Sequence, residues 1–119
     1  MIITIKNKNV SLEFGFAFLK HFGEVYNFDN YQDTINHLSK ELSDLNNITF
    51  TQEDVLKNVI LSAAIVSKSK NIDVVRNLSI MDFIVDSSET LVKIIEALSN
   101  SFPKDVGNLK ARKPASKKR

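Results

Sequence analysis

The first twenty residues constrain the fold more than any other part of this 119-residue chain. Residues 2–6 and 9–14 alternate apolar and polar side chains, which is typical of strands. The Asn7-Lys8 step between them suits a two-residue turn, because Asn tolerates positive φ. The pattern predicts a β-hairpin over residues 2–14 whose apolar face consists of Ile3, Ile5, Val10, Leu12 and Phe14. Because a lone hairpin is marginally stable in water, we expect this face to pack on helices.

An aromatic run joins this hairpin to the next element. Half of the eight phenylalanines lie within nine residues, namely Phe14, Phe16, Phe18 and Phe22. Alternation followed by helical spacing is what a strand-to-helix junction requires. It predicts a helix over about 15–25 with four inward-facing residues: Phe18, Leu19, Phe22 and Val25. The run either builds the core or offers an apolar surface to another chain.

Two longer helices are predicted next. Residues 30–46 carry an apolar stripe at helical spacing, made of Tyr31, Ile35, Leu38, Leu42 and Leu45. Thr51 and Asp54 are spaced as a capping pair and open a helix over about 52–68. That helix is apolar around much of its circumference, so we expect it to be the central helix of the core or to contact a second subunit.

The last helical region has several start signals. Residues 72–86 predict one or two short helices, with Ser79 and Asp82 spaced as a cap and its N3 acid. Asp86 and Glu89 repeat that spacing and open a final helix over 87–101. The side chains expected to face the core there are Leu91, Val92, Ile94, Ile95, Leu98 and Phe102. Pro103 then ends the helix.

Composition and charge divide the chain into two parts. An apolar fraction of 43% and a charged fraction of 25% are those of a globular domain. Residues 104–119 contain seven Lys or Arg and one acid, whereas residues 1–103 contain nine Lys or Arg and thirteen acids. The formal charges are therefore +6 and −4. We expect a mainly α fold: one domain over 1–103, with the hairpin packed on a compact bundle of about five helices, and a disordered basic tail over 104–119.

The sequence contains no recognisable catalytic arrangement. Cysteine is absent, which excludes thiolate chemistry and fits a reducing cytoplasm, and we expect neither a signal peptide nor a membrane span. His21 and His37 have no metal-ligand spacing and are interpreted as structural. An acidic metal cluster can be drawn from Asp73, Asp82 and Asp86, but two of these already have capping roles. The three glycines form no phosphate-binding loop. We expect no enzyme activity, no cofactor and no metal.

The basic tail supports an alternative function. Clustered Lys and Arg bind phosphates without further structure, so a small nucleic-acid-binding or regulatory protein that uses residues 104–119 is the second hypothesis. The tail has no aromatic side chain to stack on bases, and the body is acidic. A solubilising or connecting role is therefore favoured for it.

The order of elements resembles a known family. A short hairpin that runs into Leu12-Glu-Phe-Gly-Phe-Ala-Phe-Leu19, followed by four or five helices and a Lys-rich end, is similar to the tail assembly chaperones of long-tailed bacteriophages. These small proteins occur in phages and prophages of Gram-positive hosts. The likeness covers roughly residues 1–102. Ala17 stands where a second glycine is expected, and the Asn7-Lys8 turn lacks glycine.

This resemblance implies a role in virion assembly. Such chaperones act in the host cytoplasm, are absent from the finished particle, coat the hydrophobic tape measure protein and help recruit tail tube subunits around it. A frameshifted longer form often binds the tube (major tail) protein. Weak self-association along the client is also expected. The family motif, and the candidate protein-interaction residues, are Leu12, Phe14, Gly15, Phe16, Phe18, Leu19 and Phe22.

Overall fold

A computed structural model describes residues 1–102 of the chain. The predicted stop at Pro103 and the predicted disordered tail over 104–119 lie outside the described residues. The described part is mainly helical with an N-terminal hairpin, so the predicted fold class is confirmed. Six helices are present among residues 1–102 because region 72–86 divides into two. The elements are β1 (Ile2–Ile5), β2 (Lys8–Ser11), α1 (Phe16–Val25), α2 (Tyr31–Leu42), α3 (Phe50–Val66), α4 (Ile72–Arg76), α5 (Ile80–Asp86) and α6 (Ser88–Ser101).

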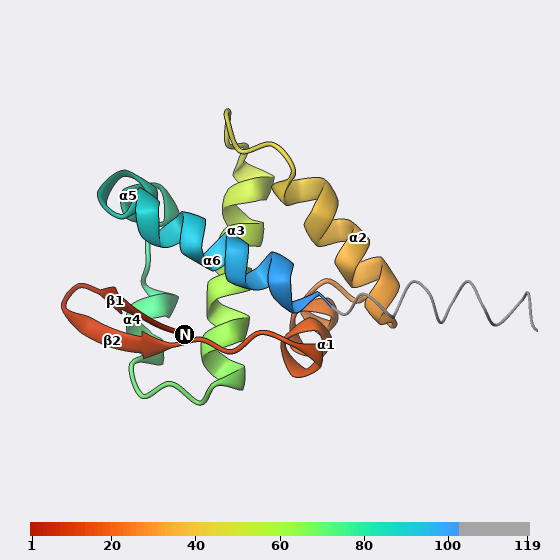
Figure 1. The fold of residues 1–119 in the computed structure, drawn as a ribbon, viewed down its shortest axis with the longest axis horizontal. Coiled ribbons are helices and arrows are strands. Elements are labelled where there is room, and N and C mark those ends of the chain that lie inside the picture. The colour runs from red at the N-terminus through yellow and green to blue at the C-terminus, as the bar shows by residue number, and fades with distance from the viewer. Residues whose placement is uncertain (103–119) are drawn as a thin grey trace, which may run out of the picture.

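The helix α3 occupies the centre of the structure (Figure 1). The pair α1 and α2 lies on one side of it, the hairpin and α4 lie on the other, and α6 crosses it, preceded by α5. Its predicted central position is confirmed, because Val55, Leu56, Val59 and Ile60 are all buried. Every helix among residues 1–102 is too short or too polar to span a lipid bilayer.

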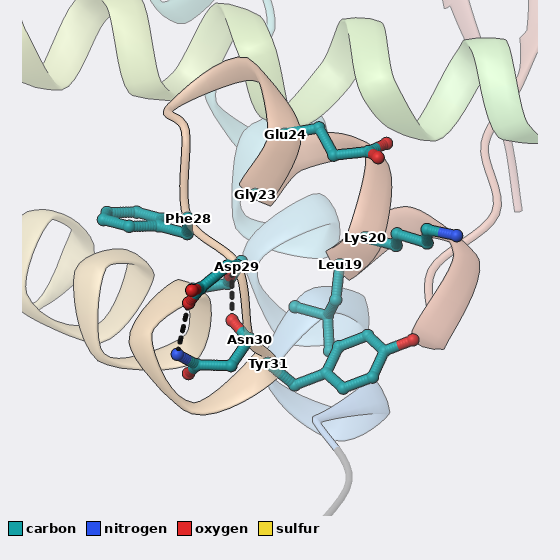
Figure 2. A pocket seen from close by; sticks show the side chains of 9 residues that line it. Leu19, Lys20, Gly23, Glu24, Phe28, Asp29, Asn30 and Tyr31 are labelled. Atoms are coloured by element: carbon teal, nitrogen blue, oxygen red, sulfur yellow. Dashed lines mark hydrogen bonds between the residues drawn. The ribbon is translucent and has the colours of Figure 1, made fainter.

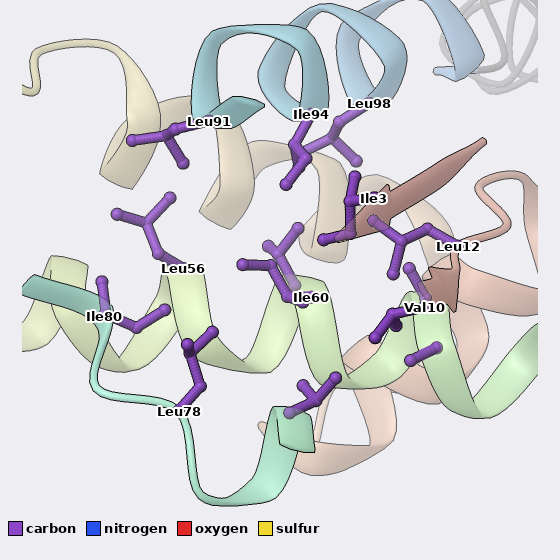
Figure 3. Close-up of a cluster of buried hydrophobic side chains, with 14 of the residues drawn as sticks. Ile3, Val10, Leu12, Leu56, Ile60, Leu78, Ile80, Leu91, Ile94 and Leu98 are labelled. Carbon is purple, nitrogen blue, oxygen red and sulfur yellow. The ribbon is translucent and has the colours of Figure 1, made fainter. Parts of the chain in front are cut away.

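The hairpin packs on the helices through one face, as predicted. Ile3, Val10 and Leu12 point toward Ile60 of α3 and toward Ile94 of α6 (Figure 3). The predicted turn is one residue late, since Ile5 pairs with Lys8 and the turn residues are Lys6 and Asn7. Both have positive φ, 50° and 65°, which is the requirement of a type I′ turn whose twist matches that of the strands.

The start of α3 and the end of α2 differ from the prediction for one reason. The capping residue of α3 is Thr49 rather than Thr51, and Gln52 completes a reciprocal capping box with it. The Gln52 amide also donates hydrogen bonds of 2.9 and 2.8 Å to the carbonyl oxygens of Glu41 and Asp44. These bonds satisfy one carbonyl in the last turn of α2 and one in the loop after it, and α2 ends at Leu42 instead of residue 46.

The C-terminal helices follow the prediction in part. Ser79 caps α5 as expected, accepting a hydrogen bond from the backbone N–H of Asp82. The predicted Asp86–Glu89 cap is wrong, because Asp86 is the last residue of α5 and α6 begins at Ser88. Val92 is 55% exposed rather than inward-facing. The core contacts of α6 come from Leu91, Ile94 and Leu98, with Ile95 and Phe102 partly buried.

Candidate protein-interaction surface

The aromatic run divides into a buried set and an exposed residue. Phe18, Leu19 and Phe22 of α1 are buried, and so is Leu12 at the end of the hairpin. Phe14 is half-buried and packs edge-on against Phe18, with ring centroids 5.1 Å apart. Phe16 is 52% exposed. Most residues of the run therefore belong to the core, whereas Phe16 belongs to the surface.

Gly15 sets the direction in which α1 leaves the hairpin. Its φ of 145° and ψ of −159° lie in a region that is essentially restricted to glycine. No atom of another residue lies within 4 Å of a Cβ built there, so backbone conformation alone requires glycine. After this residue the chain enters the first turn of α1, where Phe16 points outward and Phe18 inward.

Phe16 has a partner on the neighbouring helix. The ring of Tyr31, the first residue of α2, meets it edge-on with centroids 5.1 Å apart, and Tyr31 is itself 36% exposed. The sequence placed Tyr31 in the apolar stripe of α2 and predicted Val25 as an inward-facing residue of α1. The prediction for Val25 is wrong, since this side chain is 48% exposed.

A crevice of about 200 Å³ lies between α1 and α2 beside this pair. Leu19, Gly23 and Thr34 are buried and form its floor. Figure 2 shows the Tyr31 ring extending below Leu19 of α1, with Phe28 and Asp29 at the opposite side. We call the crevice and the Phe16–Tyr31 pair together the α1–α2 surface.

One close contact joins the two helices of this surface, and local hydrogen bonds order the start of α2. A Cβ on Gly23 would lie 2.5 Å from Oγ1 of Thr34, so glycine allows α1 and α2 to approach. Oγ1 of Thr34 donates a 3.0 Å hydrogen bond to the carbonyl oxygen of Asn30. Asn30 also caps α2, because its Oδ1 accepts a 2.8 Å bond from the N–H of Asp33.

Behind the crevice lies an aromatic cluster that shares Phe28 with the crevice lining. His37 packs against Tyr26 and Phe28, with ring centroids 4.9 and 5.3 Å away. Asn58 of α3 donates a 3.0 Å hydrogen bond to the Tyr26 hydroxyl, and burial raises the pKa of that phenol. His21 is hydrogen-bonded through Nδ1 to the buried Ser62 hydroxyl at 2.9 Å.

The described residues offer no alternative site for metal chemistry. Within residues 1–102, no three His, Cys, Asp or Glu side chains are placed so that they could hold a metal ion.

The sequence did not identify Tyr31, Gly23 or Asp29 as surface residues. Only the position of Asn30 before an apolar stripe, as a helix cap, gave a local signal for where α2 begins.

Comparison of the chain with protein-family models, with curated proteins and with solved structures finds no match.

Proposed function

We propose that this chain is a non-enzymatic phage tail assembly chaperone that coats the tape measure protein and keeps it soluble. The observation that carries the proposal is the exposed Phe16–Tyr31 pair beside the α1–α2 crevice. It lies within and next to the Leu12–Leu19 segment on which the family resemblance rests.

The physical properties of the α1–α2 surface suit an apolar client. Aromatic rings bury a large area and have few rotatable bonds, so they gain contact at a low cost in conformational entropy. Phe16 is presented by a helix whose other side is anchored in the core through Phe18 and Phe22. A small, rigid apolar patch binds weakly in each copy of the chaperone. Many copies bound side by side along one extended client would together coat it stably.

The remaining parts of the proposed role follow from the family. The chain acts in the host cytoplasm during tail assembly, is absent from the mature virion and associates weakly with further copies of itself along the client. A longer frameshifted form, where the gene encodes one, contacts the tail tube protein and recruits its subunits.

Co-expression tests the proposal. The tape measure protein from the same gene cluster is produced alone, with this chain, or with variants of it, and its soluble fraction and co-elution are measured. We expect the chain to hold the client in solution and Phe16→Ala to reduce the soluble fraction. Phe50→Ala is the matched control, because Phe50 is 88% exposed but lies at the start of α3.

The outcomes separate the proposal from its alternative. Unchanged client solubility and the lack of a co-eluting complex would overturn the chaperone function. Equal losses for the Phe16 and Phe50 variants would show that the α1–α2 surface is not the contact. DNA or RNA binding that falls with salt and vanishes on deletion of residues 104–119 would favour the nucleic-acid hypothesis instead.

A further inference from the structure

We infer that the α1–α2 surface recognises a basic apolar segment of its client, in which a Lys or Arg lies next to a large apolar side chain. The inference rests on the proposed function, because it specifies the chemistry of the client segment. It follows from the charges placed around the crevice.

Two carboxylates are fixed side by side at the edge of the crevice. The Nδ2 group of Asn30 donates hydrogen bonds of 2.9 Å to Oδ1 of Asp29 and of 2.9 Å to Oδ2 of Asp33. Both acids are exposed, and each retains oxygen atoms that can accept further hydrogen bonds. Asp29 lines the crevice, and Asp33 lies in the first turn of α2.

The rest of the crevice does not neutralise these acids. Lys20 is the basic residue among those that line it, and it precedes Glu24 by four positions on α1. Opposite charges at that spacing lie close together on a helix surface. Figure 2 shows the Lys20 and Glu24 side chains on the far side of the crevice from Asp29. The α2 edge is therefore left with a net negative charge.

The size and lining of the crevice select the occupant. About 200 Å³ is below the usual range for a small-molecule site but accommodates one long side chain. The aliphatic part of a Lys or Arg would pack on Leu19 and Gly23 while its charged group reaches Asp29. The ring of Tyr31 lies at the opposite side of the crevice from Asp29, packed against Phe16, and offers an apolar face there. An adjacent apolar side chain would cover Phe16.

Peptides of matched apolar content test this chemistry. Two amphipathic peptides with the same leucine face, one with lysines beside that face and one with glutamates in their place, are titrated into the full chain. Exposed charge pairs each change affinity by about two- to fivefold. We therefore expect the lysine peptide to bind about tenfold more tightly at low salt, and 0.5 M salt to remove most of the difference.

Variants locate the effect on the crevice. Asp29→Asn should weaken the lysine peptide about two- to fivefold and leave the glutamate peptide unchanged or slightly tighter. Asp73→Asn is the matched control, because Asp73 is an exposed acid on α4, at the other side of α3. Circular dichroism of each variant confirms that it is folded.

Three results would overturn the inference. They are equal binding of the two peptides, equal effects of Asp29→Asn and Asp73→Asn, and tighter binding of a peptide of residues 104–119, which would make this chain's own basic end the occupant. If the tape measure protein still co-elutes in any of these cases, the proposed function stands and only the client chemistry is wrong. If the client does not bind at all, the proposed function fails and the inference fails with it.

Discussion

Replacing Gly23 by alanine should destabilise the protein although it removes a glycine from a helix interior. Alanine in place of glycine normally stabilises a helix by about 1 kcal/mol. Here the new Cβ would lie 2.5 Å from Oγ1 of Thr34, which is 1% exposed and hydrogen-bonded to Asn30. Overpacking of this kind costs about 1–3 kcal/mol, and a shift of the buried Thr34 side chain would break its hydrogen bond to Asn30. The upper part of that range applies, which leaves a net loss of about 1–2 kcal/mol.

Urea denaturation followed by circular dichroism measures this loss, which corresponds to about 5–10 °C in Tm for a domain of this size. A double-mutant cycle with Thr34→Ala identifies its cause. In the Thr34→Ala background the clash is gone, so Gly23→Ala should be neutral or stabilising by up to about 1 kcal/mol. The reasoning is refuted if Gly23→Ala is as stable as the wild type, or if it costs the same in both backgrounds.

Three further changes have defined outcomes. Gly15→Ala should cost about 1–3 kcal/mol from backbone conformation alone, since its φ is 145° and its Cβ would touch nothing, and thermal denaturation measures the loss. Gln52→Leu removes three hydrogen bonds and should lower the free energy of unfolding by about 2–4 kcal/mol, which urea denaturation would measure as a lower midpoint. In a Tyr31→Phe variant the phenol of Tyr26 should ionise above its ordinary pKa of about 10 in an ultraviolet titration. Because the folded-state pKa is raised, the contribution of this phenol to stability should be unchanged up to about pH 10 and fall above it, as the unfolded chain loses the proton first. Asn58→Leu, which removes the hydrogen bond to Tyr26, should raise that pKa further.

Local patterns were sufficient to predict the fold class but not the helix ends. The sequence contains two overlapping capping signals before α3, at Thr49 and at Thr51, and each is followed by a polar residue three positions later. The first is used because the Gln52 amide also reaches the carbonyl oxygens of Glu41 and Asp44. The choice between the two caps therefore depends on how the loop between α2 and α3 folds back, which capping patterns do not encode.

The exposed residues of α1 and α2 were harder to predict than the buried ones. Helical spacing correctly placed Phe18, Leu19 and Phe22 in the core, because long apolar side chains on one face of a helix have to be covered. The same spacing wrongly placed Val25 there, and it gave no sign that Tyr31, at the start of the α2 stripe, is 36% exposed. Periodicity gives the direction of a side chain relative to its own helix, whereas its burial depends on whether another element covers that turn.

The division of the aromatic run determines which substitutions can report on function. Phe18 and Phe22 are fully buried, so truncating either to alanine removes core packing worth about 3–5 kcal/mol, and a loss of client binding would not be separable from the loss of stability. Phe16 is 52% exposed and packs edge-on against Tyr31, so its truncation costs less stability than that of a buried phenylalanine. A loss of client binding is therefore evidence for the α1–α2 surface only when it follows from Phe16, while the buried phenylalanines test the fold that presents it.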